Sequence, residues 1–386
     1  MTGKRKDNKG RILKKGEGQR PNGTYYYKYK DFHDKYIYVY AKTLDLLRQK
    51  EAEIDRDISD GVDRTLGNLT VVELIDKYLS MKRKLKPRTE EAYQSAVSRI
   101  RKDPFGDRCI RDIKMSDAKA WFVQLHDSGL KRGTIYNIKT IVKPAFELAM
   151  DDDLIRKNPF SFILSDLLPD DRLKRPALTK EQQKRYLKFI EHNGNGNFLD
   201  DIIILLETGL RVSELYGLTF KDVDLQNRRI YVKQQLYKTK SGEYRVSTPK
   251  SESGIRTVPL SFEACSAISR VIRNRPKPKI ELLIGNSTGF LFLDRFSRPK
   301  TAHHLEAYMR MMNKKYTQMF GNNMPKVTPH VLRHTFCTNL YQAGIDPKSL
   351  QYIMGHSTFD ITLSLYTHSN DYDYIEKSFR KVSDSM

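Results

Sequence analysis

The sequence predicts a multidomain α+β protein. It favours a small N-terminal domain with a β-sheet and a helix, an all-α second domain, and a mostly helical third domain with a small antiparallel sheet. Three observations support this fold class. A length of 386 residues leaves room for two or three separate cores. Alternation typical of strands occurs near residues 24–41 and again at 229–260, whereas helical spacing of apolar residues marks the stretch between them.

The N-terminal domain is expected to span residues 1–65. Two tyrosine-rich runs, 24–30 and 36–41, alternate as strands do, and a charged helical pattern begins at Leu44. That helix should stop at Gly61, because glycine favours helix ends. Lysine and arginine residues are frequent in the N-terminal stretch from Lys4 to Arg20 and in the strands. The positive charge of this domain should therefore lie there rather than on the helix.

The second domain is expected at residues 66–170 and should be all-helical. Thr70 and Glu73 form a capping-box pattern ahead of apolar residues at helical spacing. Ser116 and Thr134 are expected to cap two further helices, because small hydroxyl side chains favour that position.

The third domain, expected at residues 171–366, begins with a second capping box and an apolar helix. Thr179 with Gln182 supplies the box, and the helix at 198–208 should end at Gly209. The remainder is predicted to be helical except for three strand-like runs, at 229–236, 244–248 and 256–260.

A tail at residues 367–386 follows. Its apolar residues are spaced three, four and three apart, so a helix here would carry one apolar stripe: Tyr372, Ile375, Phe379 and Val382. Such a stripe must be buried, either on its own domain or on a neighbouring protomer.

The net charge limits the partners of the chain. It carries 69 Lys+Arg against 47 Asp+Glu, a formal net charge of +22, which favours nucleic acid or an anionic membrane surface. The longest aliphatic run, 202–206, is far shorter than the roughly 20 apolar residues that span a bilayer. Nucleic acid is therefore the expected partner. The candidate DNA contacts are Lys4, Arg5, Lys14, Lys15, Arg20, Tyr25, Tyr27, Lys28, Lys82, Arg83, Lys84, Lys86 and Arg88.

The cysteines and the N-terminus indicate a compartment. Cys109, Cys265 and Cys337 match neither a zinc spacing nor a disulfide framework, so no metal site is expected. No apolar stretch follows the basic N-terminus, so no secretory signal is expected. A reducing, intracellular compartment fits both observations.

Two segments of the third domain offer cations that suit a phosphodiester. Arg211 stands on a tight turn after the apolar helix, where it can present a rigid guanidinium fork to a phosphate, and Glu214 can hold that fork. Surface pairs of this kind usually mean little. Lys250 begins a predicted turn between two strands, where a lysine is usually only solvated.

Two further segments add histidines, an arginine and a tyrosine. Thr328 should cap a helix whose first turns carry His330 and Arg333 on one face, at an end that already favours anions. His356 lies on the loop after a helix that ends at Gly355, and Tyr366 follows ten residues later. Each of these signals is modest when taken alone.

The ordered set is specific. Arg211, Lys250, His330, Arg333, His356 and Tyr366 occur in the order and approximate spacing of the tyrosine recombinase family, which the chain resembles. The stretch from His330 through Leu-Arg-His-Thr-Phe, followed by Met-Gly-His and then Tyr-Thr-His, is highly specific to that family. The N-terminal Lys9-Gly-Arg-Ile-Leu-Lys-Lys-Gly-Glu and Tyr25-Tyr-Tyr-Lys-Tyr resemble the arm-binding domain of integrases from bacterial conjugative transposons.

Two positions depart from the common family pattern. Met354 stands where a leucine is commoner, which should matter little. The interval from His356 to Tyr366 is ten residues where many members have nine, and the conjugative-transposon subgroup resembles this longer form.

The resemblance implies a site-specific DNA recombinase that works through a 3′-phosphotyrosine without metal, nucleotide or other cofactor. Tyr366 would be the nucleophile. Arg211 and Arg333 would hold the non-bridging oxygens, with Glu214 in support. Lys250 would protonate the leaving 5′ oxygen, His330 would accept the tyrosine proton, and His356 would donate a hydrogen bond to the phosphate.

The resemblance also implies partners. These are double-stranded DNA, with core crossover sites and separate arm-type sites, and a homo-oligomer on DNA, expected to be a tetramer. Residues 66–170 would bind the core site, and the tail would be exchanged between protomers. An accessory excision factor and a bacterial cytoplasmic, nucleoid-associated location complete the expectation.

Three other functions stay open at this point. A type IB topoisomerase uses a similar residue set, although strand relaxation needs no second DNA address. A DNA-binding regulator that had lost the chemistry would not need all six residue types. A metal-dependent transposase with an acidic triad would leave the order of these residues unexplained.

Overall fold

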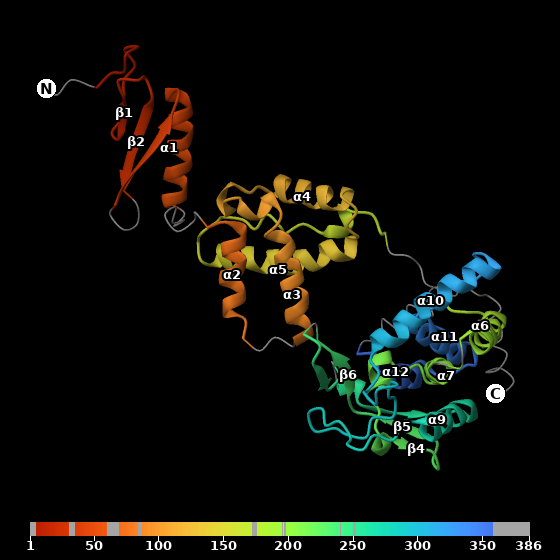
Figure 1. Cartoon of the computed structure of the whole chain (residues 1–386). Coiled ribbons are helices and arrows are strands. Elements are labelled where there is room, and N and C mark those ends of the chain that lie inside the picture. Colours follow the sequence, from red (N-terminus) through yellow and green to blue (C-terminus); the bar gives the residue numbers. More distant parts are fainter. Residues whose placement is uncertain are drawn as a thin grey trace, which may run out of the picture. The chain divides into compact units, whose positions relative to one another are not determined.

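The computed structural model describes residues 5–30, 35–59, 69–83, 87–171, 176–194, 196, 198–239, 241–249 and 252–357 (Figure 1). Outside this description lie Lys4, Lys84, Lys86, Lys250, Tyr366, the tail at 367–386 and the side chain of Arg88. The chain divides into two compact units, residues 1–173 and 174–386. The predicted α+β fold class is confirmed, because helices dominate the description and its sheets are small and antiparallel.

The first unit begins with a three-stranded sheet and a helix. Strands β1 (Glu17–Gln19), β2 (Tyr25–Lys30) and β3 (Tyr36–Ala41) pair antiparallel in that order, and α1 (Leu44–Ser59) packs on one face. The two predicted strands and the helix are confirmed. Strand β1 was not predicted, because three residues that include a glycine show no alternation.

The rest of the first unit is helical. Its longer helices are α2 (Val71–Met81), α3 (Pro87–Ile100), α4 (Met115–Asp127) and α5 (Arg132–Asp151). They close around an aromatic core in which the rings of Phe105 and Trp121 stack with their centroids 4.2 Å apart.

The predicted helix starts of the first unit fare differently. Thr70 caps α2 as expected: its hydroxyl accepts from the Glu73 N–H, and the Glu73 carboxylate accepts from Thr70 N. The predicted caps Ser116 and Thr134 are wrong. Both lie inside their helices, one or two residues after the first, and a lysine occupies each N-cap position instead.

The second unit surrounds one large apolar core. Its helices are α6 (Lys180–Asn193), α7 (Leu199–Thr208), α8 (Val212–Leu215), α9 (Phe262–Asn274), α10 (Ala302–Phe320), α11 (Pro329–Gln342) and α12 (Pro347–Met354). Strands β4 (Val223–Asp224), β5 (Arg229–Val232) and β8 (Arg256–Pro259) form one antiparallel sheet, and β6 (Gln235–Lys238) pairs with β7 (Tyr244–Ser247).

Two predictions for this unit need correction. The run at 229–236 is broken at Lys233 and Gln234, where the side-chain amide of Gln234 donates to the carbonyl of Gly217. Residues 275–301 form turns and isolated bridges rather than a helix. Within the described ranges, no helix combines the length and apolar character needed to cross a membrane.

Candidate active site

The candidate active site forms where the corner between α7 and α8 meets the start of α11 and the end of α12. These segments are distant in sequence but are tied by side chains. Arg333 on α11 donates to the carbonyl of Gly209, and Arg211 donates to the carbonyl of Gly355 over 3.1 Å. All three helix ends belong to the second unit, so the site is defined within one body.

Arg211 is oriented by the turn on which it stands. The apolar helix α7 ends at Gly209, whose φ of +62° suits glycine, and a Cβ there would collide with the ring of Phe336. Arg211 is then the extended N-cap residue of α8. The buried carboxylate of Glu214 accepts from the Arg211 backbone N over 2.9 Å and from its Nη1 over 2.7 Å. One edge of the guanidinium is therefore fixed, and the side chain stays partly exposed.

Arg333 and His330 stand on the first turns of α11. The Thr328 hydroxyl accepts from Val331 N, and Pro329 takes the first helical position, as predicted. His330 is exposed, whereas Arg333 is buried and donates to the carbonyls of Gly209 and Met354. Burial, reinforced by the charge of Arg211, lowers the pKa of Arg333 to about 9.

His356 lies just beyond the end of α12. Gly355 closes that helix with φ +62°, and His356 N donates to the carbonyl of Gln351 over 3.2 Å. Burial lowers the pKa of His356 to about 4, with Arg333, Arg211 and Arg256 adding to the effect. The imidazole is therefore neutral at pH 7 and can donate one hydrogen bond.

Arg256, on β8, is a site residue that the sequence analysis missed. Its Nη2 lies 2.9 Å from Oε2 of Glu214, and its Nε donates to the carbonyl of Ile353 over 2.7 Å. The available signal was alternation: Arg256 shares the inward face of its strand with the buried Val258. A cation at an inward position requires a buried anion.

The electrostatic balance of the cluster is positive. Arg211, Arg256 and Arg333 carry three positive charges against the single carboxylate of Glu214. Burial alone would raise the pKa of Glu214, but Arg256 and Arg211 together lower it, so this carboxylate is ionised. The net excess makes the site suited to an anion such as a phosphodiester. Across the described ranges, no group of three His, Cys, Asp or Glu side chains is placed to hold a metal ion.

The structure thus brings together four of the predicted residues, Arg211, Glu214, Arg333 and His356. His330 lies one turn before Arg333 on the same helix. Lys250 belongs to the connection between β7 and β8, and Tyr366 to the segment after His356. Both fall outside the described residues, so their roles stay predictions.

The N-terminal sheet places its predicted contacts on two faces. Lys28 lies on the outer face, with Nζ 3.7 Å from the ring centroid of Tyr36, and Arg20 lies over the ring of Tyr40 at 4.4 Å. Tyr25 instead faces α1: it is buried, donates to Asp7 over 2.9 Å and accepts from Arg11 over 2.8 Å.

The remaining predicted contacts are mostly exposed. Tyr27 shares the inner face with Tyr25 and donates weakly to Asp55. Arg5, Lys14 and Lys15, which precede β1, are exposed, and so are Lys82 and Arg83, which follow α2. On the outer face of the sheet, the exposed tyrosines that the sequence analysis did not select are Tyr36, Tyr38 and Tyr40.

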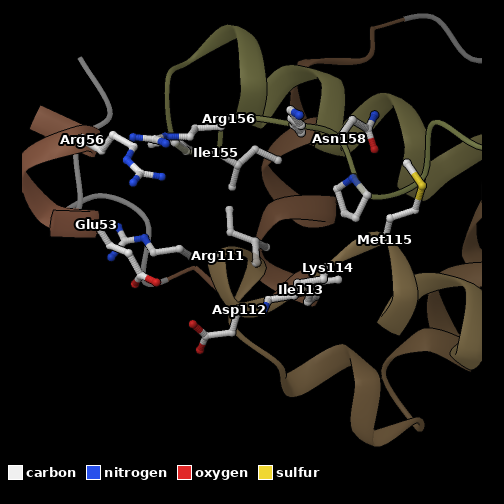
Figure 2. Close-up of a pocket in the computed structure, with 14 residues that line it drawn as sticks. Glu53, Arg56, Arg111, Asp112, Ile113, Lys114, Met115, Ile155, Arg156 and Asn158 are labelled. Atoms are coloured by element: carbon white, nitrogen blue, oxygen red, sulfur yellow. The ribbon is translucent and has the colours of Figure 1, made fainter. Parts of the chain in front are cut away.

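A second cationic group lines a pocket of about 680 Å³ in the first unit (Figure 2). Arg111 and Lys114 come from the segment before α4, and Arg156 and Lys157 from the segment after α5. Figure 2 shows Arg111 and Arg156 reaching toward the same part of the pocket. None of the four was among the predicted contacts, because they come from two separate short segments, 111–114 and 156–157, rather than from one run of positive charge.

Comparison with protein families covers both ends of the chain. The phage integrase family matches residues 176–372, and the DNA-binding domain of Tn916 integrase matches residues 1–58. The transposase from transposon Tn1545 of Streptococcus pneumoniae is 40% identical over 383 residues, covering 96% of this chain and 94% of the relative. The transposase from transposon Tn916 of Enterococcus faecalis is 40% identical over the same shares.

Comparison with solved structures also finds integrases. The Tn1549 transposon integrase in complex with a circular intermediate DNA is 39% identical and superposes with a TM-score of 0.75, covering 81% of this chain and 99% of that one. A lambda integrase dimer bound to a core site is 18% identical, with a TM-score of 0.57 over 92% of this chain and 95% of that one, which shows a likeness of fold.

Proposed function

The chain belongs to the phage integrase family, whose members are tyrosine recombinases, and from this premise we propose that it inserts and excises a conjugative transposon through a 3′-phosphotyrosine intermediate. It is a DNA-binding recombinase of the transposon-integrase type. One observation carries the proposal: Arg211, Arg333 and a neutral His356 converge on the end of α12 with an excess of positive charge.

Strand cleavage would be an in-line displacement at phosphorus. The hydroxyl oxygen of Tyr366 forms a bond to the scissile phosphorus, and the bond from phosphorus to the 5′ oxygen of the next nucleotide breaks. His330 accepts the proton of the tyrosine, whose ordinary pKa near 10 keeps it protonated at neutral pH. Lys250 donates a proton to the leaving 5′ oxygen, because an alkoxide is a poor leaving group.

The arginines would act on the charge of the phosphate. Arg211 and Arg333 each hold a non-bridging oxygen and offset the negative charge that develops in the transition state. His356, neutral before DNA arrives, donates one further hydrogen bond. Strand joining is the reverse attack by a 5′ hydroxyl, so one phosphodiester replaces another and no nucleotide is consumed.

The domain organisation that we propose provides two separate DNA-binding specificities. Residues 1–65 would read arm-type sites with the outer face of the sheet, and residues 66–170 would hold the core site. Residues 171–366 would carry the chemistry. A tetramer, with residues 367–386 exchanged between protomers, would couple cleavage to the pairing of two sites.

The decisive test is to trap the covalent complex. A duplex with a nick near the crossover point loses the short cleaved strand, so the protein stays attached to DNA and the linked peptide can be identified by mass spectrometry. Tyr366 is the expected attachment residue. Attachment at another residue, or an absence of any adduct with active protein, contradicts the proposed mechanism.

The role of Lys250 has its own test. Lys250→Ala should slow cleavage of an ordinary substrate, but much less so when the leaving 5′ oxygen is replaced by sulfur, because a thiolate leaves without an acid. Equal impairment on both substrates would assign the acid to another residue, with Lys238 and Lys240 the next to test.

A further inference from the structure

Three consecutive backbone carbonyls at the end of α12 are each bound by a different arginine. Arg256 donates to Ile353 over 2.7 Å, Arg333 donates to Met354, and Arg211 donates to Gly355 over 3.1 Å. The last carbonyls of a helix have no partner within the helix and carry partial negative charge, so guanidinium groups suit them. The loop that carries His356 is therefore held by the two arginines that are proposed to hold the phosphate, Arg211 and Arg333, and by a third, Arg256.

Arg256 differs from the other two in how its donors are used. Its Nε binds Ile353, its Nη1 binds Glu214 over 3.3 Å and Gly254 over 3.1 Å, and its Nη2 binds Glu214 over 2.9 Å. Four of the five N–H groups of a guanidinium are thus engaged. The side chain is 0% exposed. Arg256 therefore has no surface with which to touch DNA.

Glu214 receives two hydrogen bonds on each carboxylate oxygen. Oε1 accepts from the Nη1 atoms of Arg211 and Arg256, and Oε2 accepts from the Arg211 backbone N and from Arg256 Nη2. A carboxylate offers about four lone-pair sites, so this one is saturated. Arg256 fixes the rotation of the Glu214 carboxylate and shares the negative charge of that group with Arg211. Part of the positive charge of Arg211 therefore stays available to another anion.

Arg256 also contacts the loop of His356 directly. A Cβ on Gly355 would lie 2.8 Å from Arg256 Nη1 and 3.0 Å from its Cζ, so the guanidinium packs against the bare Cα. The positive φ of Gly355 excludes most side chains at that position as well. The position of His356 thus depends on Arg256 through both a hydrogen bond to Ile353 and van der Waals contact with Gly355.

We propose that Arg256 is a positioning residue for DNA cleavage: it neutralises and orients Glu214, so that Arg211 keeps its charge for the scissile phosphate, and it holds the loop of His356. This inference rests on the proposed function. Without Arg256, Glu214 pairs with Arg211 alone, and the resulting neutral pair attracts a phosphate less strongly. The defect should therefore depend on the charge of the phosphate.

The test compares two substrates in single-turnover cleavage. One carries the natural scissile phosphate, and the other carries a methylphosphonate, in which a methyl group replaces one non-bridging oxygen and removes the charge. Arg256→Gln should form the covalent complex roughly 10–100-fold more slowly than wild type on the natural substrate, the range typical of groups that orient a ligand. On the methylphosphonate, the difference from wild type should shrink to a few-fold.

Arg275→Gln is the matched control. Arg275 is also a largely buried arginine of the second unit, donating to the carbonyl of Phe290 over 2.8 Å and pairing with Glu281 over 2.8 Å, and neither partner belongs to the site. The Arg275→Gln variant should have a lower melting temperature than wild type, and its ratio of cleavage rates on the two substrates should equal that of wild type. Arg256→Lys, which keeps the charge and loses the fork, serves if Arg256→Gln does not fold, and should give a smaller defect of the same kind.

The outcomes separate the two hypotheses. If wild type forms no covalent complex, the proposed function fails. If wild type does form it, and both Arg256 variants are equally impaired on the two substrates or are unimpaired, the proposed function stands and the positioning role of Arg256 is wrong.

Discussion

The two regions that we propose to contact DNA hold their positive charge by opposite means. At the end of α12, Arg256 and Arg333 are buried and bound by carbonyl and carboxylate oxygens. On the N-terminal sheet, Lys28 and Arg20 lie over tyrosine rings, and Tyr36 is 55% exposed. Buried cations are costly but fixed, which suits stabilisation of a transition state. Exposed cations on rings can adjust, which suits recognition of a DNA surface.

Tyr366→Phe should produce the largest difference between cleavage, which depends on the active site, and DNA binding. Loss of the nucleophilic oxygen should abolish covalent complex formation, while affinity for core and arm-type duplexes stays within about two-fold of wild type, since no phosphate contact of the arginines is removed. Gel electrophoresis under denaturing conditions measures the first, and a binding assay at fixed salt measures the second. A variant that still forms the adduct would show that another residue attacks the phosphate.

Arg333→Gln should act on the buried region alone. Removing a preorganised donor to the developing charge typically slows the chemical step by about 100- to 1,000-fold. Affinity for an arm-type duplex should not change, because the N-terminal sheet belongs to the first compact unit and Arg333 to the second. Single-turnover rates and arm-site binding, measured on the same preparation, check both parts. Parallel losses in the two assays would mean that the variant is misfolded or that the regions are not independent.

Lys28→Ala should show the converse pattern. It removes an exposed cation from the outer face of the sheet, so arm-site affinity should fall by roughly three- to ten-fold and the salt slope of binding by about 1. Cleavage of a bare core site should not change. Tyr25→Phe is the control on the inner face: it breaks the hydrogen bonds of a buried hydroxyl, so it should cost stability of about 1 kcal/mol without altering the salt slope.

The last prediction is a pH dependence of stability that comes from His356. Its pKa falls from an ordinary 6.5 to about 4 in the folded chain, so the unfolded chain binds more protons between these values. The contribution to stability is therefore full above pH 6.5 and is lost as the pH falls toward 4. His356→Gln should flatten that part of the stability profile, measured by denaturant unfolding at several pH values. An unchanged slope would mean that the imidazole is less confined than its surroundings indicate.

Local sequence signals predicted much of the fold. Thr70 with Glu73 and Thr328 with Pro329 determine helix starts within four residues, so they can be recognised without tertiary information. The prediction that Ser116 caps α4 was wrong, because a hydroxyl side chain near a helix start does not by itself determine where the helix begins. The backbone N of Lys114 finds its acceptor on Asp117, which begins the helix earlier.

The site was predictable where motifs are contiguous, and not where partners are distant. Arg211 and Glu214 are three residues apart, so their pairing was anticipated. Arg256 was missed because Glu214 lies 42 positions before it and Ile353 lies 97 positions after it. Tertiary packing brings β8 both to Glu214 on α8 and to Ile353 on α12.

The surplus positive charge at the end of α12 has a thermodynamic consequence for the protein without DNA. Burial lowers the pKa values of Arg333 and His356, and the neighbouring arginines lower them further, so added positive charge is disfavoured at this end of the helix. Any anion that binds the native site and not the unfolded chain must then stabilise the second unit in proportion to the logarithm of its concentration. A recombinase kept in sulfate or phosphate buffer should melt at a higher temperature than one kept in chloride at equal ionic strength. Its half-life in the cell would likewise lengthen while it occupies DNA.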